Sequence, residues 1–537
     1  MSTISGIDIA VIVIYLAAIL GVGLWIVRKK KMNAEGYFLA GHSLKWPAIG
    51  AALFASNIST VHLVGLAASG YNDGLVWGNY EWMAVFVLIL LALVFSPFYF
   101  KNKISTLPEF LEKRYGRFAR MCLACLGILG ALFIHIGVSL YAGAVVFENL
   151  FGINIYVSIF LISGVTAIYT VIGGLESVVI TETIQTVILI TGSLMLTILG
   201  IMALPDQGIT NWTELKEAVK PEQLSIIPTA NNSSGLSWQA ILLGYPVLGI
   251  WYWCADQTIV QRVLGAETLK DAKVGPIFAG FLKILPVFIM VLPGVLGYVL
   301  FSDLIVEADD TLLVLITELM PVGLIGLMSA ALLAALMSTI AAALNSAGTL
   351  VSIDIFKTIK PDISDRKQVL IGRITAVVVM VIAILWSPII AKFDSIFEAI
   401  NILLTVISPP ISAVFIWGVF WKRGNNPAAI ATFAGGFVLG LIAFLIDFPI
   451  IGDTKLITEG LGISFMMQAW WLFVACSAIF VGTSLLTKEP DYEKIQDYTL
   501  DSPAAFLKDY RRKESKDSMI LSILLIVIMA ILYGSFS

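Results

Sequence analysis

Apolar runs long enough to cross a bilayer recur along this chain from its first residues to its last. A hydrocarbon core about 30 Å thick requires roughly twenty apolar residues in a helix. About fourteen such runs can be marked, over residues 7–27, 47–68, 79–100, 120–148, 153–172, 178–203, 236–256, 274–301, 319–350, 370–389, 395–419, 427–446, 463–486 and 518–536. The runs are continuous rather than alternating, which favours helices over an outer-membrane barrel. We therefore predict an all-α polytopic membrane protein.

The composition agrees with a membrane protein and excludes several other classes. Of the 537 residues 13% are charged and 58% are hydrophobic, whereas a soluble chain would carry roughly a quarter charged residues. The sequence has no phosphate-binding P-loop motif, which argues against an ATP-driven pump. Its four cysteines and three histidines show no metal spacing. We expect no cofactor, no nucleic acid and no obligatory protein partner; the lipid bilayer is the expected surrounding.

The distribution of Lys and Arg predicts the orientation in the membrane. When the spans alternate in direction, the basic clusters at 28–31, 101–120, 262–273, 357–373, 422–423 and 488–516 all fall on one side. The opposite side holds only Lys216, Lys220, Lys392 and Lys455. Because cytoplasmic loops are rich in Lys and Arg, the basic side is assigned to the cytoplasm. Both termini are then expected outside a cell membrane, plasma or inner.

Polar side chains crowd into the second apolar run, where lipid would favour Leu or Val. Five of them fall within seven residues: Ser56, Asn57, Ser59, Thr60 and His62. Glu81 lies just inside the next run. Such groups are costly in hydrocarbon and normally face a cavity or one another. We interpret the stretch as half of a small-molecule site at mid-membrane, and polar contacts between packed helices remain the alternative.

The seventh run is also interrupted, by Pro246 and Gly249, five runs after the polar stretch. Proline removes a backbone hydrogen bond and glycine loosens a helix. Two interrupted helices in corresponding positions of two five-helix halves are typical of an inverted repeat with a central site. The expected organisation is a flanking helix in 1–40, a first repeat in 41–203, an extracellular loop in 204–235, a second repeat in 236–425, and flanking helices in 426–537 with a cytoplasmic linker at 487–517.

Several residue types in these runs suit a sugar. Lys283 lies deep in an apolar run and needs a partner, for which Asp256, Glu81 and a bound hydroxyl are candidates. Aromatic faces stack on the C–H faces of sugar rings, and a cluster of aromatics comprises Tyr80, Trp82, Trp251, Tyr252 and Trp253. Glu81, His62, Lys283 and Asn401 could bond hydroxyl groups. An interfacial aromatic belt is the competing interpretation.

Oxygen ligands for a hard cation are available in the long ninth run. Ser338 and Thr339 are adjacent hydroxyls among small residues. Hard cations take hydroxyl oxygens and backbone carbonyls freed by an unwound helix. Ala55 and Ile58 could offer such carbonyls. A contact between helices through small residues is an equally open interpretation.

These stretches closely resemble the sodium/solute symporter family, and within it the sodium/glucose cotransporters. The matching motifs are Asn57-Ile-Ser-Thr-Val-His62, Tyr80-Glu81-Trp82, Gly173-Gly174, Trp251-Tyr252-Trp253-Cys-Ala-Asp256-Gln257, Phe281-Leu-Lys283, Ser338-Thr339 with Leu344-Asn345-Ser346, and Pro409-Pro410. The resemblance covers nearly the whole chain. It implies the LeuT-type fold of five plus five helices in inverted repeats, with additional flanking helices.

The resemblance also implies a role for particular residues. Ligands of sugar hydroxyls would be Asn57, His62, Glu81, Lys283 and Asn401, where the family usually has Gln at the last position. Tyr252 would stack on the sugar as an inner gate, with Trp253 beside it. The sodium ligands would be the carbonyls of Ala55, Ile58 and Ala335 and the hydroxyls of Ser338 and Thr339.

One departure from the family pattern predicts the stoichiometry. Some members have a second sodium site that uses an Asp and further hydroxyls, and here those positions are Glu182, Ala341 and Ala342. We therefore expect one sodium per sugar. The expected function is sodium-driven uptake of a neutral monosaccharide of the glucose or galactose type.

Other functions stay open from the sequence. The substrate could be myo-inositol, proline or an organic anion, although no arginine is expected within the core spans, which argues against an anion. A proton-coupled symporter could use Glu182 and Asp256. A transporter-like sensor or a passive channel is a further alternative.

Overall fold

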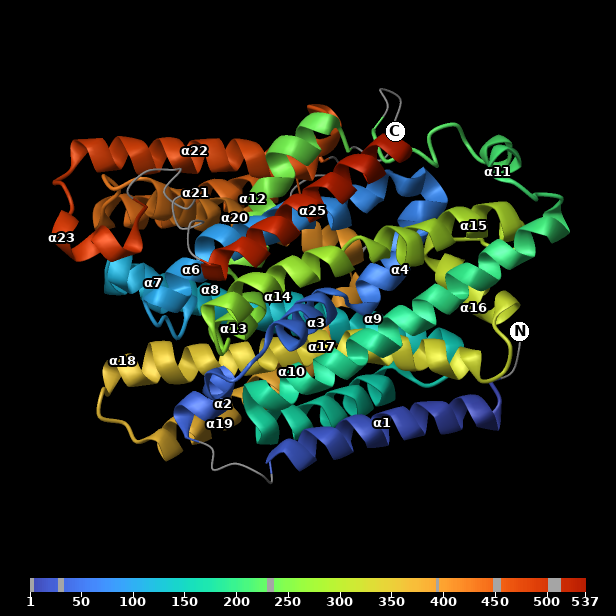
Figure 1. Cartoon of the computed structure of the whole chain (residues 1–537), viewed down its shortest axis with the longest axis horizontal. Helices are drawn as coiled ribbons and strands as arrows, with labels where there is room; N and C mark the ends of the chain where they lie inside the picture. Colours follow the sequence, from blue (N-terminus) through green and yellow to red (C-terminus); the bar gives the residue numbers. More distant parts are fainter. Residues whose placement is uncertain (1–3, 28–32, 229–235, 393–395, 448–454, 501–512) are drawn as a thin grey trace.

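A computed structural model describes residues 4–27, 33–228, 236–392, 396–447, 455–500 and 513–537, and it is built almost entirely of helices (Figure 1). Helices cover each of the fourteen predicted spans within these residues. The only β-bridge in the described part of the chain pairs Leu44 with Ala266. The prediction of an all-α chain is therefore confirmed.

The helices of the first half follow the predicted spans in order. They are α1 (Gly6–Val27), α3 (Trp46–Asn57) with α4 (Thr60–Asp73), α5 (Asn79–Leu90) continued by α6 (Ser96–Lys101), α8 (Arg117–Leu129) continued by α9 (Ser139–Phe151), and α10 (Ile155–Ala203). Three short helices, α2 (Ala34–Leu39), α7 (Leu107–Arg114) and α11 (Trp212–Ala218), lie between or beside them.

The second half begins with α12 (Tyr245–Ile250) and α13 (Gln257–Leu264), which form one broken helix. It continues with α14 (Leu269–Leu282) and α15 (Leu292–Phe301), then α17 (Leu324–Thr349), α19 (Asp365–Trp386) and α20 (Ile396–Phe420). The last apolar helices are α21 (Asn426–Asp447), α22 (Phe465–Leu486) and α25 (Lys513–Ser535). The boundaries that we predict for the repeats and the linker stay predictions, and residues 501–512 of that linker lie outside the described part.

Ten helices of the described chain are long and apolar enough to cross a membrane; Ile155–Gln207 contains two predicted spans, and Thr60–Lys101 contains the third span and the end of the second. The longest covers 53 residues, Ile155–Gln207, which as a straight rod would measure about 80 Å. It turns at Gly174, whose φ of 65° and ψ of −163° are not helical. A Cβ there would lie 2.5 Å from the Tyr37 carbonyl oxygen. Glycine is therefore required where the fifth and sixth spans meet.

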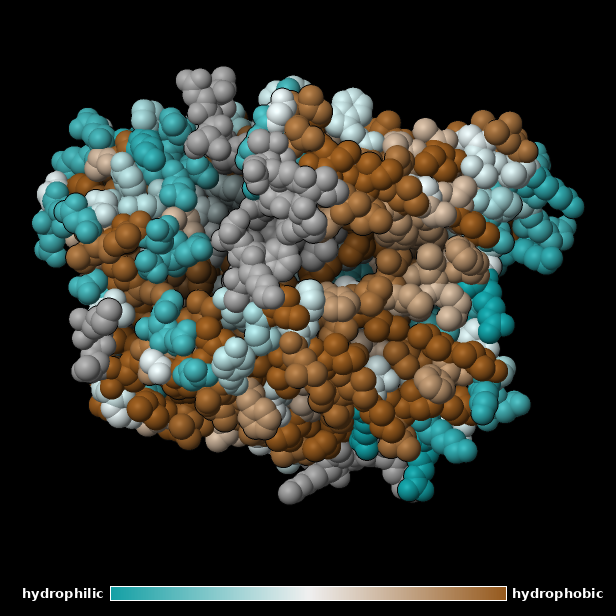
Figure 2. Space-filling view, turned by 180° about the vertical axis from the view of Figure 1, so that it is seen from behind, coloured by the Kyte–Doolittle hydropathy of each residue, from teal (hydrophilic) through white to brown (hydrophobic). Residues whose placement is uncertain are grey.

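Apolar side chains cover much of the outer surface. Figure 2 shows hydrophobic residues across the middle of one face and hydrophilic residues gathered at its two ends. Large exposed apolar residues occur along α1, α10, α19 and α25, for example Ile14, Phe160, Leu385 and Ile531. An apolar girdle with polar ends is the surface that a bilayer requires.

Two of the spanning helices are broken near their middle. The first break lies between α3 and α4, where Ile58 (φ −79°, ψ 115°) and Ser59 (φ −110°, ψ 172°) are extended. The second lies at Asp256 (φ −84°, ψ 122°), between the π-helical turn Trp251–Ala255 and α13. The position predicted for the second break, Pro246 with Gly249, is wrong. A π-helical turn at Ala240–Gly244 precedes Pro246, and the chain stays helical through Gly249.

Candidate functional site

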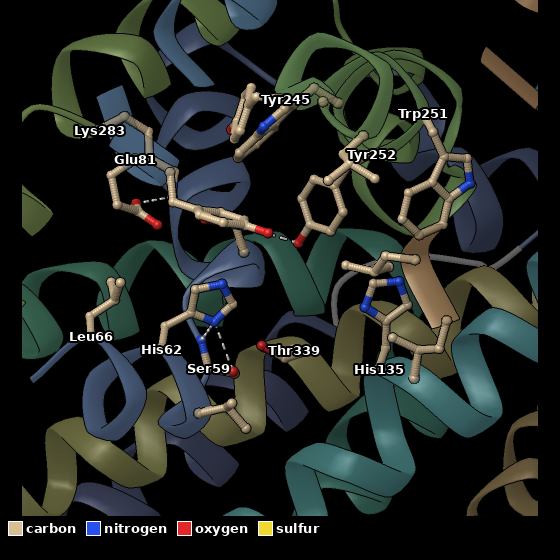
Figure 3. A pocket seen from close by; sticks show the side chains of 18 of the residues that line it. Ser59, His62, Leu66, Glu81, His135, Tyr245, Trp251, Tyr252, Lys283 and Thr339 are labelled. Atoms are coloured by element: carbon tan, nitrogen blue, oxygen red, sulfur yellow. Dashed lines mark hydrogen bonds and ion pairs between the residues drawn. The ribbon is translucent and has the colours of Figure 1, made fainter. Parts of the chain in front are cut away.

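A cavity of about 140 Å³ lies between the two breaks, far above the roughly 10–15 Å³ that one water molecule needs. It is lined by all seven predicted substrate residues whose side chains the structure describes: Asn57, His62, Tyr80, Glu81, Tyr252, Trp253 and Lys283. Asn401 lies in α20, but its side chain falls outside the described residues. In Figure 3, His62, Glu81 and Lys283 approach the cavity from one side, and Tyr252, Trp251 and His135 from the other.

Lys283 links the helices at one end of the cavity. Its Nζ donates to Glu81 Oε2 and to Asn57 Oδ1, and the lysine and the glutamate are 1% and 2% exposed. Of the three partners considered from the sequence, Glu81 is the one that forms the ion pair. Asn57 Nδ2 in turn donates to the Tyr252 hydroxyl at 3.1 Å. A substrate entering here meets a continuous chain of polar groups from both repeats.

His62 caps the helix that begins after the first break. The backbone N–H of Ser59 donates to His62 Nδ1 at 3.3 Å, and the Ser59 hydroxyl lies 3.0 Å from the same nitrogen. An N-terminal side chain that receives a free backbone N–H stabilises the helix start. Because Nδ1 accepts that proton, neutral His62 carries its hydrogen on Nε2. His62 can therefore offer a donor to the cavity.

His135 is a cavity residue that sequence reasoning missed. Its Nε2 lies 3.0 Å from Asp256 Oδ2, and Asp256 Oδ1 accepts from the Thr258 N–H at 3.0 Å to cap α13. The carboxylate fixes the hydrogen on Nε2, which leaves Nδ1 as an acceptor. A histidine inside an apolar helix was the available signal, but His135 was weighed only as a metal ligand. Ser59, from the predicted polar stretch, also lines the cavity, and so do Ser139 and Tyr245, which were not predicted.

Aromatic rings form a further part of the cavity wall, and some of them contact the polar chain. The Tyr80 and Tyr245 rings meet edge to face at 5.6 Å, and the Tyr252 and Trp253 rings at 5.1 Å. Lys283 Nζ lies 5.4 Å from the centre of the Trp253 ring. Trp82, which belongs to the predicted aromatic cluster, does not line the cavity. Its Nε1 donates to the Ile284 carbonyl at 3.3 Å, and its ring packs on Tyr533.

The five predicted sodium ligands come together beside this cavity. Ser338 Oγ lies 2.8 Å from the Ala55 carbonyl oxygen and 2.9 Å from that of Ala335. Thr339 Oγ1 lies 3.2 Å from the Ala335 carbonyl oxygen and 3.4 Å from that of Ile58. The Ser56 carbonyl oxygen, at 3.2 Å from Thr339 Oγ1, is a further oxygen here. Neutral oxygens freed by a broken helix suit a hard monovalent cation.

Glu182, one of the positions at which this chain departs from the family pattern, forms a buried ion pair with Arg262. Arg262 donates to both carboxylate oxygens of Glu182, through Nε at 3.2 Å and through its terminal nitrogen. The two side chains are 1% and 0% exposed. The expectation that no arginine lies within the core is wrong, because α13 carries Arg262 back into the protein interior after the second break.

Two broken helices around a polar, aromatic-lined cavity within the bilayer are the architecture of secondary transporters. The fold matches the solved structure of a sodium-coupled sialic acid symporter in a substrate-bound, outward-open state, with a TM-score of 0.76, 23% identity, and coverage of 90% of this chain and 99% of that one. Mhp1, a nucleobase-cation-symport-1 family transporter, matches with a TM-score of 0.54, 15% identity, and coverage of 87% and 99%. The fold is thus the LeuT type, with two five-helix inverted repeats and flanking helices.

The sequence model of the sodium:solute symporter family matches residues 37–436, and the chain belongs to that family. The human sodium/myo-inositol cotransporter is 36% identical over 92% of this chain and 75% of its own length. Sodium/glucose cotransporter 1 of sheep (Ovis aries) is 34% identical over 90% and 79%. The chain is therefore a multi-pass, sodium-coupled symporter of a small solute.

Proposed function

We propose that this chain couples inward sodium flow to the uptake of a neutral monosaccharide of the glucose or galactose type. The two charged side chains that line the cavity balance one another, since Glu81 pairs with Lys283. A balanced site favours a neutral solute over an organic anion, because an anion would need an unpaired cation. Hydroxyl-rich rings fit the combination of aromatic faces with donors and acceptors.

The observation that carries the proposal is that one broken segment serves both sites. Asn57 takes part in the polar chain of the cavity, while the carbonyls of its neighbours Ala55 and Ile58 face Ser338 and Thr339. Thr339 itself also lines the cavity. Sodium bound to these oxygens would order the segment that holds the sugar ligands. Sugar would then bind more tightly, and by reciprocity so would sodium.

The residues take the following roles in this proposal. Hydroxyl ligands of the sugar are Asn57, His62, Glu81, Lys283 and Asn401, while Tyr80, Tyr252 and Trp253 supply aromatic surface. Sodium is held by Ala55, Ile58, Ala335, Ser338 and Thr339. Closing of the site and rocking of the two repeats then expose both solutes to the cytoplasm. We place the chain in the cell membrane with both termini outside.

One sodium per sugar is the proposed stoichiometry. Glu182 is engaged by the Arg262 guanidinium, and Ala341 and Ala342 offer no hydroxyl at the positions that would complete a second site. Simultaneous measurement of sodium and sugar fluxes in proteoliposomes should give a ratio of one. A ratio of two would contradict the proposal.

Myo-inositol is the second candidate substrate, because relatives named for it reach 36–37% identity with this chain. Myo-inositol and the hexoses present similar hydroxyl arrays, and Asn401 is the position where this chain departs from the usual Gln.

The deciding experiment measures uptake of labelled glucose, galactose and myo-inositol into proteoliposomes under an inward sodium gradient, with choline replacing sodium at fixed pH as the control. Accumulation of one solute only with sodium would support the class and name the substrate. Uptake that persists in choline and follows a proton gradient would favour the proton-coupled alternative.

A further inference from the structure

A group of buried polar atoms without partners lies between α13 and α17, outside the cavity described above. Within the described part of the chain, both amide atoms of Asn345, the Thr258 hydroxyl and Gln261 Oε1 take part in no hydrogen bond. Their side chains are 5%, 1% and 0% exposed, in that order. Buried polar groups are almost always bonded, because leaving them without a partner is costly. Water or another small polar ligand would supply the missing partners.

A hydrogen bond fixes the register of the two helices here. Gln261 Nε2 donates to Thr349 Oγ1 and to the Phe38 carbonyl of α2, both at 2.7 Å. Thr258 precedes Gln261 by one helical turn, and Asn345 precedes Thr349 by one turn. Both helices run from the cavity towards the end of the molecule that holds α2. Thr258 and Asn345 therefore lie at the same level, one turn nearer the cavity than Gln261.

On α17, Asn345 of this group lies on the same helix face as the proposed sodium ligand Ser338. Asn345 follows Ser338 by seven residues, which is close to two full turns and roughly 10 Å along the helix axis. It lies on the C-terminal side of Ser338 and Thr339. In the orientation proposed above, this is the direction of the cytoplasm.

The charge around the group suits brief occupation by a monovalent cation. Its oxygens are one hydroxyl and two amides, all neutral. Arg262 follows Gln261 in sequence, but its charge is paired with Glu182. Fewer charged ligands give weaker cation sites, so sodium would be held loosely here. The Asn345 amide nitrogen would bond water of the ion's hydration shell.

We propose that Thr258, Gln261 and Asn345 form a hydrated relay site through which sodium leaves the Ser338–Thr339 site towards the C-terminal end of α17. The relay rests on the sodium site proposed above. It assigns these residues a role in the rate of sodium release, whereas Ser338 and Thr339 set the strength of sodium binding.

The test measures exchange of radiolabelled sodium across proteoliposomes that contain the full chain. Thr258→Val keeps the side-chain shape and removes the hydroxyl, and Asn345→Leu removes both amide atoms. Each variant should slow sodium release roughly three- to ten-fold. The external sodium concentration for half-maximal exchange should stay unchanged, since Ser338 and Thr339 are untouched. Ser329→Ala is the matched control on α17, because the Ser329 hydroxyl is already bonded to the Ile325 carbonyl at 2.8 Å.

Sodium release at the wild-type rate in Thr258→Val would overturn the relay and leave the group as a dry contact or a structural water site. Thr258→Val alone decides the matter where Asn345→Leu does not fold. The experiment measures sodium exchange and does not depend on sugar transport. A wild-type chain that exchanges sodium but carries no sugar would therefore refute the proposed substrate, while the relay could still be tested. A wild-type chain that exchanges no sodium would overturn the relay together with the sodium site.

Discussion

The two helix breaks differ in what they present to the cavity. Between Asn57 and Ser59 the first break presents an amide side chain, a histidine that caps the next helix, and carbonyl oxygens that point to Ser338 and Thr339. At Asp256 the second break follows a run of three aromatic residues and presents a single carboxylate, which caps α13 and contacts His135. The first break therefore adjoins both the sugar cavity and the sodium site, whereas the second adjoins the cavity and, through Thr258, the proposed relay.

The two breaks are therefore expected to have different roles in the binding of sodium and sugar. Changes at the first break should alter sodium and sugar binding together, because its backbone joins the two sites. Changes at the second break should alter sugar binding and leave sodium binding as it is. A set of variants can test this division, ordered here from the largest expected effect to the smallest.

Ser338→Ala should have the largest effect, because it removes the hydroxyl that faces Ala55 of the first break. We expect sodium to lose its stimulation of sugar uptake, measured as uptake against sodium concentration with choline as the replacement. Thr339→Ser retains a hydroxyl and serves as the control with sodium stimulation preserved. Full sodium dependence in Ser338→Ala would remove this serine from the sodium site.

Lys283→Met should come next, because it leaves the Glu81 carboxylate buried without its cation. Breaking a buried pair on one side costs about 3–5 kcal/mol, so the thermal unfolding temperature in detergent should fall markedly. The double variant Glu81→Gln with Lys283→Met should recover much of the stability, while sugar binding stays lost. An unfolding temperature equal to that of the wild type in Lys283→Met would show that Glu81 does not need this partner.

His62→Ala should raise the sugar concentration for half-maximal uptake about ten-fold, or ~1.4 kcal/mol. The variant removes the proposed Nε2 donor and the contact that caps α4. The sodium requirement for half-maximal uptake should rise with it, because the first break adjoins both sites. If only the sugar requirement changes, His62 acts on the substrate without linking the two sites.

Asp256→Asn should have the smallest effect. Asparagine can still accept from the Thr258 N–H, so α13 keeps its cap, while His135 loses its charged partner. We expect the sugar concentration for half-maximal uptake to rise roughly two- to five-fold. The sodium concentration for half-maximal uptake should not change. Asp256→Ala, which also removes the cap, should lose about 1 kcal/mol of stability besides. A changed sodium concentration for half-maximal uptake in Asp256→Asn would contradict the separate roles expected of the two breaks.

The sequence predicted the fold well where the bilayer itself constrains the chain. Each span needs a long apolar run, and polar residues as dense as those from Ser56 to His62 normally face a cavity or one another. The second break was misplaced because Pro246 is a visible helix breaker, although the π-helical turn before it leaves the helix intact. The actual break is at Asp256, whose role as a cap depends on a backbone conformation that its residue type does not dictate.

Part of the candidate site was also predicted from the sequence, and part of it was missed. The sequence predicted that Lys283, too deep in an apolar run to reach water, needs a partner, and the structure selects Glu81 from the three candidates. Arg262 was taken for part of a basic loop, because its neighbours in sequence are basic and only the short α13 returns it to the interior. His135 was overlooked because its partner, Asp256, lies 121 residues away in the sequence.

The neutral oxygens of the proposed sodium site have a consequence for electrical behaviour. No carboxylate stands among Ala55, Ile58, Ala335, Ser338 and Thr339, so the charge of a bound sodium ion is not cancelled by its ligands. The loaded carrier would then move one net positive charge, whereas the cavity pairs Glu81 with Lys283 and adds none. An inside-negative potential of 100 mV favours the inward step by about 2.3 kcal/mol per charge. The return of the empty carrier would be nearly insensitive to voltage, and hyperpolarisation would accelerate only the loaded half of the cycle.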